Sequence, residues 1–275
     1  MKKHLIPCML SVMALLLLAP GLAGAKDIQQ ELARQSTIEK VLRQGELRVG
    51  MSTFVPWAMQ DKTGEWIGFE IDMATKLAQD MGVEVKFVPT KWEGLIPGLL
   101  TGKFDLIIAG MMGTPQRALK INFTQPYDFS ALQILANKEV AAGMDEVADY
   151  NKPEVTVLVR NGTTAVAAVK QVLPRAETRL FMENGPMVQE LLNGKAHCIV
   201  NSSPEPAQLA LKFPDKLFYI EEPLMKQPIS IGVQKGDPDT LAYLNNWITV
   251  VRNQGFIQEK ADYWWKSVEW RSRIE

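Results

Sequence analysis

The chain has 275 residues, with 30 Lys and Arg, 31 Asp and Glu, and a formal net charge of −1. Its hydrophobic content of 47% and charged content of 22% are typical of a globular protein, and the near-neutral charge excludes the basic patch that binds nucleic acid. With two Cys and two His residues, the sequence excludes a disulfide framework, a cysteine-based zinc site and a multi-histidine metal centre. We therefore expect no metal and no cofactor.

The N-terminus has the pattern of a cleavable secretory signal. Lys2 and Lys3 precede an apolar run that is too short to span a membrane, and a small-residue cleavage pattern ends at Ala25. We predict a signal peptide at residues 1–25, with a retained membrane anchor as the alternative. Cleavage would leave one thiol, Cys198, which we expect to be a small buried hydrophobic side chain.

Strand and helix patterns alternate along the rest of the chain. After a polar helical segment near 28–43, the first half predicts strands at 47–51, 83–88 and 104–109 and helices at 70–81 and 95–100. The second half repeats this order, with strands at 155–159, 179–182, 197–200 and 217–220 and helices at 163–173, 187–192 and 204–213. The alternation favours parallel sheets with helices on both faces.

Two segments at corresponding places in the halves are similar. Residues 99–110 can be laid over residues 191–202, so that the helix-ending glycine, the next lysine and the apolar strand coincide. Any joint of helix, glycine and strand could give this match. The alternative is two similar α/β lobes whose equivalent strand ends, at Gly110 and Ser202, face each other across a cleft, because open α/β sheets bind ligands beyond the carboxyl ends of their strands.

An arginine follows the first of these strand ends. Thr114 is a suitable N-cap and Pro115 a suitable first helical residue, which places Arg117 in a short helix after Gly110. There its guanidinium could bind a carboxylate in bidentate fashion. An ordinary solvated or salt-bridged arginine is the alternative.

Aromatic and hydroxyl residues lie in other connections between strands and helices. Phe54, Trp57 and Trp92 fall in loops of the first half, where large apolar side chains can line a pocket or simply pack. In the second half, Thr163 and Thr164 open a helix whose free N–H groups could bind an anion, although such a start is also ordinary capping.

Five short motifs follow one another through most of the chain. They are Gly-Phe-Glu-Ile-Asp-Met-Ala at 68–74, Leu-Ile-Pro-Gly-Leu at 95–99, Gly-x-x-x-Thr-Pro-x-Arg at 110–117, Phe-Thr-x-Pro-Tyr at 123–127, and a glycine at 255 followed by Tyr-Trp at 263–264. In this order they resemble the periplasmic amino-acid-binding proteins of ABC transporters, solute-binding protein family 3. The resemblance covers roughly residues 40–266.

The resemblance implies an α/β protein with the type II periplasmic binding protein fold. In this fold two α/β lobes are joined by two hinge strands, and a ligand cleft lies between them. The first lobe would be discontinuous, with residues 26–134 and 231–275, and the second would hold residues 135–230. The chain would cross between the lobes near residues 132–138 and 229–233.

The resemblance also implies roles for individual residues. Arg117 would bind the α-carboxylate of the ligand, together with the backbone N–H groups of Met112 and Thr164. Gly110 would offer its carbonyl to the ligand ammonium. Phe54 and Trp92 would enclose the ligand side chain, and no catalytic residue is implied.

The implied function is that of a periplasmic solute-binding component of an ABC transporter. It would capture an amino acid or a related small carboxylate and deliver it to a membrane permease. Its partners would be the small ligand and the permease subunits, and we expect a monomer. The alternatives are a periplasmic enzyme on the same scaffold, similar to cyclohexadienyl dehydratase, and the ligand sensor of a signalling system.

The chain departs from the family pattern at one wall of the cleft. Ser202 stands where the family usually has an aspartate for the ligand ammonium, and His197 stands at an upstream acidic position. A hydroxyl cannot neutralise a desolvated cation, and Arg160 could add a second positive charge. These residues favour ligands richer in carboxylate than in ammonium. The alternative is that Glu183 or Glu205 supplies the missing negative charge.

Overall fold

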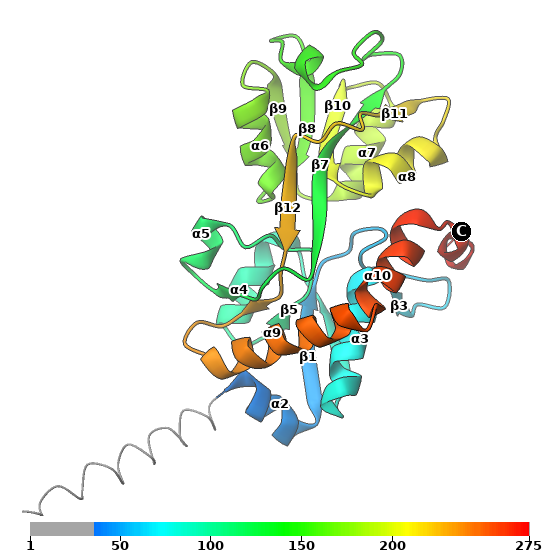
Figure 1. Ribbon diagram of the computed structural model, residues 1–275. Coiled ribbons are helices and arrows are strands. Elements are labelled where there is room, and N and C mark those ends of the chain that lie inside the picture. Colours follow the sequence, from blue (N-terminus) through cyan, green and yellow to red (C-terminus); the bar gives the residue numbers. More distant parts are fainter. Residues whose placement is uncertain (1–35, 275) are drawn as a thin grey trace, which may run out of the picture.

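The computed structural model describes residues 36–274, which form two α/β lobes joined by a pair of strands (Figure 1). The predicted signal peptide at residues 1–25 lies outside the described residues. Within residues 36–274, no helix has the length and apolar character that crossing a membrane requires.

A five-stranded sheet forms the centre of the first lobe. Its strands are β1 (Glu46–Met51), β4 (Glu84–Pro89), β5 (Leu106–Ile107), β6 (Asn122–Phe123) and β13 (Gly232–Val233). They lie in the order β4-β1-β5-β13-β6. The strands β4, β1 and β5 are parallel, whereas β13 runs antiparallel to β5 and β6. A separate hairpin pairs β2 (Met59–Gln60) with β3 (Trp66–Ile67).

Helices cover both faces of this sheet. The helices are α2 (Thr37–Gln44), α3 (Phe69–Met81), α4 (Leu95–Leu100), α9 (Pro238–Asn253) and α10 (Phe256–Ala261). Leu106 packs in the core shared with α2, α3, α9 and α10, whereas the next residue, Ile107, packs in the core shared with α4. Successive side chains of a strand point to opposite faces, so this alternation places α4 alone on its face of β5. The aromatic residues Trp264 and Trp270, beyond α10, are buried in the larger core.

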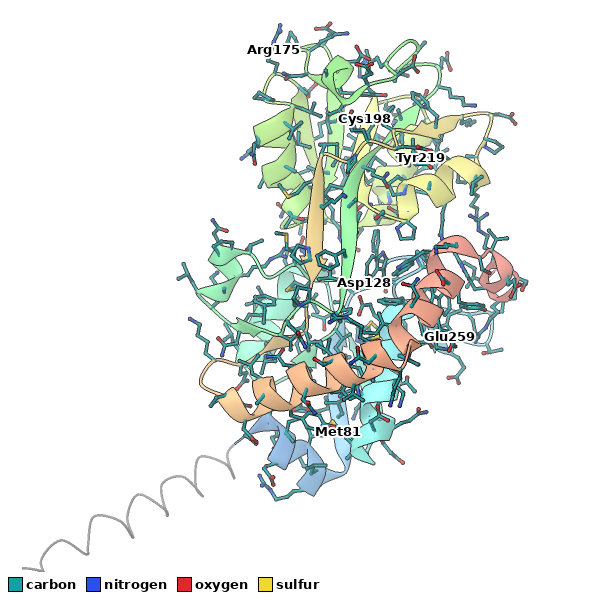
Figure 2. The ribbon with its side chains drawn as sticks, viewed as in Figure 1. Met81, Asp128, Arg175, Cys198, Tyr219 and Glu259 are labelled. Carbon is teal, nitrogen blue, oxygen red and sulfur yellow. The ribbon has the colours of Figure 1, made fainter. Side chains whose placement is uncertain are left out.

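A second sheet forms the centre of the second lobe. Its strands are β7 (Asp128–Asn137), β8 (Thr156–Arg160), β9 (Glu177–Phe181), β10 (Cys198–Ser202), β11 (Leu217–Tyr219) and β12 (Met225–Ile229). They lie in the order β11-β7-β10-β8-β9, and β12 pairs with β7. Helix α6 (Thr164–Val172) covers one face, and α7 (Asn184–Leu192) with α8 (Glu205–Lys212) covers the other. Cys198 is fully buried in this lobe, as predicted (Figure 2).

The parallel pairing expected from the alternating strand-helix units is found within those units, but neither sheet is parallel throughout. The strands β8, β9 and β10 are parallel, but β7 is antiparallel to β10, β11 and β12. The reason is that β7 enters the second sheet from the first lobe, whereas β13 returns to the first sheet after β12. Neither strand belongs to an alternating strand-helix unit, so the periodicity of those units does not set its direction.

The pair of β7 and β12 joins the lobes. The two strands are antiparallel, from Leu132 opposite Met225 to Asp128 opposite Ile229. Figure 2 shows Asp128 at the level where the two lobes meet. These two strands are the hinge strands of a type II periplasmic binding protein fold. The lobe boundaries at residues 134/135 and 230/231 stay a prediction.

Candidate functional site

One cavity between the lobes is lined by the ten residues that the sequence suggested for ligand binding, but not by Glu183 or Glu205. Its walls include Phe54, Trp57, Trp92, Gly110, Met112, Arg117, Arg160, Thr163, Thr164 and Ser202. Gly110 and Ser202, the last residues of the two overlaid segments, therefore line the same cavity. The role of each residue in contacting a ligand stays a prediction.

The cavity also has lining residues that the sequence analysis did not select. They are Ser52, Ala109, Ser130, Leu132, Ala165, Asn201, Gln227 and Ile229. Ser52 directly follows β1, so the rule that ligands bind beyond strand ends could have found it. Ser130 and Gln227 lie on the hinge strands, where the pattern of the sequence carries no binding signal.

Arg117 reaches the cavity from the first lobe. It lies in the one-turn helix α5 (Pro115–Ala118), whose N-cap Thr114 accepts a hydrogen bond from the Arg117 N–H. Its guanidinium donates to the Met112 carbonyl at 2.9 Å and, across the cleft, to the Gly162 carbonyl at 3.0 Å. Burial lowers the pKa of Arg117, and no acidic side chain of residues 36–274 offsets this effect. The guanidinium thus keeps donors for a carboxylate that the described protein does not supply.

Arg160 reaches the cavity from the second lobe, at the end of β8. It is 6% exposed, and its guanidinium donates across the cleft to Ser52 Oγ at 3.1 Å. Within its own lobe it donates to the Met182 carbonyl at 3.4 Å. Glu183 Oε2 lies 3.9 Å from Arg160 Nη2, a loose ion pair whose acid is half exposed. Burial lowers the pKa of Arg160, and the nearby carboxyl groups, led by Glu183, oppose that shift.

Trp92 lies against both guanidinium groups. The Arg117 and Arg160 Cζ atoms are 5.4 Å and 5.9 Å from the centre of its ring, within the range of cation–π attraction. Its indole Nε1 donates to the Gly162 carbonyl at 3.0 Å. Hydrogen bonds from Trp92, Arg117 and Arg160 therefore all cross the cleft and link the two lobes.

A buried carboxyl group lies behind the second-lobe wall. Glu205 is 5% exposed and accepts hydrogen bonds from the side-chain amides of Asn184 and Asn201. Burial raises the pKa of Glu205 to about 8, against the smaller opposing effect of these amides and of Arg160. Asn201 lines the cavity and Glu205 does not. Neither Glu183 nor Glu205 is thus a cavity wall residue that could neutralise a bound ammonium group directly.

A second buried carboxyl group lies behind the first-lobe wall. Glu70 is 1% exposed and accepts from the Tyr127 hydroxyl at 2.7 Å and 2.8 Å. The Gly110 N–H also donates to this carboxyl group, yet burial raises the pKa of Glu70 to about 8. Gly110 therefore links the buried glutamate to the cavity wall. Trp57 adjoins Gly110 and packs its ring against Phe69.

Comparisons with known proteins agree with this architecture. The chain is 27% identical to the L-cystine-binding protein TcyJ of Escherichia coli over 236 residues, which covers 86% of this chain and 88% of that protein. It is 25% identical to the cyclohexadienyl dehydratase of Pseudomonas aeruginosa over 239 residues, which covers 84% of this chain and 87% of that enzyme.

A solved structure shows the same fold. The putative binding component of an ABC transporter from Wolinella succinogenes, crystallised with lysine, superposes with a TM-score of 0.78 at 37% identity. The superposition covers 83% of this chain and 99% of that protein. Residues 47–267 match the sequence pattern of one family over most of the described chain. The chain belongs to the bacterial extracellular solute-binding proteins, family 3.

Proposed function

We propose that the chain is the periplasmic solute-binding component of an ABC transporter, which captures an amino acid or a related small carboxylate and delivers it to a membrane permease. The observation that carries this proposal is Arg117, a largely buried guanidinium that faces the interlobe cavity without an acidic partner among the described residues. A cation in such a place is stabilised when a ligand brings the anion.

The mechanism follows from the contacts that cross the cleft. A ligand carboxylate would bind Arg117, while the Gly162 carbonyl keeps that guanidinium against the second lobe. Trp92 and Arg160 would then complete the closed arrangement through Gly162 and Ser52. Because the chain passes between the lobes along β7 and β12, hinge closure would couple ligand capture to a shape that a permease can recognise.

The test is calorimetric titration of the wild type and of Arg117→Ala with acidic, neutral and basic amino acids and with short dicarboxylates. We expect Arg117→Ala to lower the affinity for the bound probes by about 100-fold or more, because it removes a charged bidentate contact. The melting temperature of the empty protein should change little, since the Arg117 guanidinium forms no ion pair with the described residues and its hydrogen bonds there go to two carbonyl groups.

Arg179→Ala is the matched control. Arg179 lies on β9 of the second lobe and pairs with Glu177 at 2.9 Å, and it does not line the cavity. Its removal should leave the affinity unchanged. Unchanged affinity in Arg117→Ala, or a wild type that binds none of these probes, would contradict the proposal.

A dehydratase is the second candidate, favoured by the similarity to the Pseudomonas enzyme. Loss of a hydroxyl group needs a general acid within reach of the substrate. Ser202 occupies the strand end that is best placed for one, and Glu205 lies behind Asn201. We therefore expect no turnover of prephenate or arogenate, and measurable turnover would favour the enzyme over the binding protein.

A further inference from the structure

The walls of the interlobe cavity carry two positive charges and no negative one. Arg117 and Arg160 line the cavity from opposite lobes, and no Asp or Glu among the described residues lines it. The acid that comes nearest to Arg160, Glu183, lies 3.9 Å away and keeps half of its side chain in solvent. An ion pair of this kind is weak. Glu93, whose Oε1 atom is buried without a hydrogen-bond partner in the described residues, also raises the Arg160 pKa but does not line the cavity.

The polar groups that lack partners at this cavity are hydrogen-bond donors. Trp57 Nε1 and Gln227 Nε2 are buried and have no acceptor among residues 36–274, and both residues line the cavity. Gln227 uses its Oε1 atom to accept from the Thr164 hydroxyl at 2.7 Å, which leaves its amide nitrogen free to donate. A buried donor without an acceptor costs free energy, so a ligand that supplies acceptor oxygens would be favoured.

An ammonium group would find no ionic partner at the second-lobe wall. Ser202 offers only a hydroxyl group, and Asn201 uses its Oδ1 atom to accept from the Ser202 N–H at 2.9 Å. The carboxyl group behind them, Glu205, is engaged by the amides of Asn184 and Asn201. Its raised pKa, about 8, keeps it largely protonated and neutral near pH 7.

The Arg160 guanidinium retains donors for a ligand. Of its five N–H groups, the structure uses one on Met182 and one on Ser52. The Cζ atoms of both guanidinium groups lie within 6 Å of the centre of the Trp92 ring, at 5.4 Å and 5.9 Å, so they are at most about 11 Å apart. A small molecule with an acidic group at each end could contact both.

We propose that the ligand is a small dianion, with one carboxylate on Arg117 and a second acidic group on Arg160. This inference rests on the proposed function, because it concerns the same cavity. It identifies the chemical class of the ligand as a dicarboxylic amino acid or a short diacid. It also makes Arg160 the residue that determines specificity, and it makes the ligand ammonium dispensable.

The test compares isosteric probes on the wild-type protein by calorimetric titration. The probes are aspartate with asparagine, glutamate with glutamine, the diacids succinate and glutarate, and lysine. We expect the acid of at least one pair to bind about tenfold to a hundredfold more tightly than its amide, because a charge-assisted hydrogen bond is replaced by a neutral one. Lysine should bind more weakly than that acid.

The variant Arg160→Gln sharpens this test. It should lower the affinity for the acid much more than the affinity for its amide, so that the preference for the acid disappears, while loss of the contact with Ser52 lowers both affinities. Arg179→Gln, on the exposed side of the same lobe, should leave the preference intact. The comparison of the wild-type affinities needs no variant, so it holds even if Arg160→Gln folds poorly.

The outcomes separate the two proposals. Tight binding of lysine, or an amide that binds as tightly as its acid, would overturn the dianion class while the solute-binding function stands. A preference that survives in Arg160→Gln would overturn the role of Arg160. Failure of all the probes to bind would overturn the dianion class and the proposed function together.

Discussion

In each lobe, one residue between a helix-ending glycine and the next strand bonds to an earlier strand of the sheet, but the side chain that does so differs. In the first lobe, the Asp105 N–H donates to the Arg48 carbonyl at 2.9 Å, and the Asp105 carboxylate accepts from the Arg48 N–H at 3.0 Å. In the second lobe, the His197 N–H donates to the Thr156 carbonyl at 3.0 Å, and His197 Nδ1 accepts from the Thr156 N–H at 3.0 Å. Asp105 and His197 occupy the same position when residues 99–110 are laid over 191–202.

The difference between these two residues lies in charge. The Asp105 carboxylate also binds the Arg48 guanidinium at 2.7 Å and Lys40 Nζ at 3.1 Å, whereas His197 makes one neutral contact, and burial lowers its pKa. The backbone hydrogen bond to the earlier strand is nevertheless equivalent in the two lobes. The repeated scaffold therefore fixes which residues pair with that strand, Leu106 and Ile107 in the first lobe and Cys198 and Ile199 in the second, while the side chains beside them differ.

The largest expected effect concerns the two buried glutamates, one behind each wall. Glu70 and Glu205 both have pKa values raised to about 8 by burial, so the native state holds protons that the unfolded chain releases near pH 4.5. Their contribution to stability is therefore fully present below pH 4.5 and is lost as the pH rises to about 8. For each group the loss is on the order of 5 kcal/mol.

Denaturant unfolding at several pH values measures this loss. In Glu70→Gln and in Glu205→Gln the titrating group is gone, so the free energy of unfolding should fall less between pH 5 and 8 than it does in the wild type. The two variants should reduce the slope by similar amounts. If neither variant changed the pH dependence of the free energy of unfolding, the raised pKa values of Glu70 and Glu205 would be contradicted.

The next largest effect concerns the equivalent residues Asp105 and His197. Asp105→Ala should destabilise the protein by about 3 kcal/mol, because it leaves Arg48 without the buried carboxylate that binds it. His197→Ala should cost about 1 kcal/mol, since it removes one neutral hydrogen bond to Thr156. Asp105→Asn, which keeps an acceptor but loses the charge, should fall between them. Urea unfolding at pH 7 gives these values, and equal losses at the two positions would show that the charge contributes nothing.

The smallest expected effect concerns the glycines that end α4 and α7. Gly102 and Gly194 have φ values of 71° and 69°, a conformation that costs other residues about 1 kcal/mol. An added Cβ would meet nothing at Gly102 and would lie at ordinary contact distance from Val140 at Gly194. Gly102→Ala and Gly194→Ala should therefore each cost about 1 kcal/mol in urea unfolding. A large difference between the two losses in unfolding free energy would show that the two glycines are not equivalent.

Much of this architecture could be predicted from the sequence, because it depends on local signals. The helix predicted at 95–100 is α4 (Leu95–Leu100), and the strand predicted at 155–159 lies within one residue of β8 (Thr156–Arg160). The strand predicted at 104–109 was too long, since only Leu106 and Ile107 pair with β1. An apolar run shows that a segment is buried, but it does not show which of its residues find a partner strand.

The contacts that complete the site could not be predicted, because they join distant residues. The Gly162 carbonyl accepts from both Arg117 and Trp92, and Arg160 donates to Ser52 in the opposite lobe. Nothing local in the sequence signals such contacts. In the same way, whether a given glutamate lies at a cavity wall or behind it depends on the packing of the whole lobe.

A crystal structure of the protein with glutamate, or with the acidic probe that binds most tightly, would show directly which residues hold the ligand. We expect one carboxylate at about 3 Å from the Arg117 guanidinium and the second acidic group at the same distance from Arg160. The opposite result is an Arg117 that pairs with an acid of the protein or turns into solvent, with the ligand bound away from both arginines.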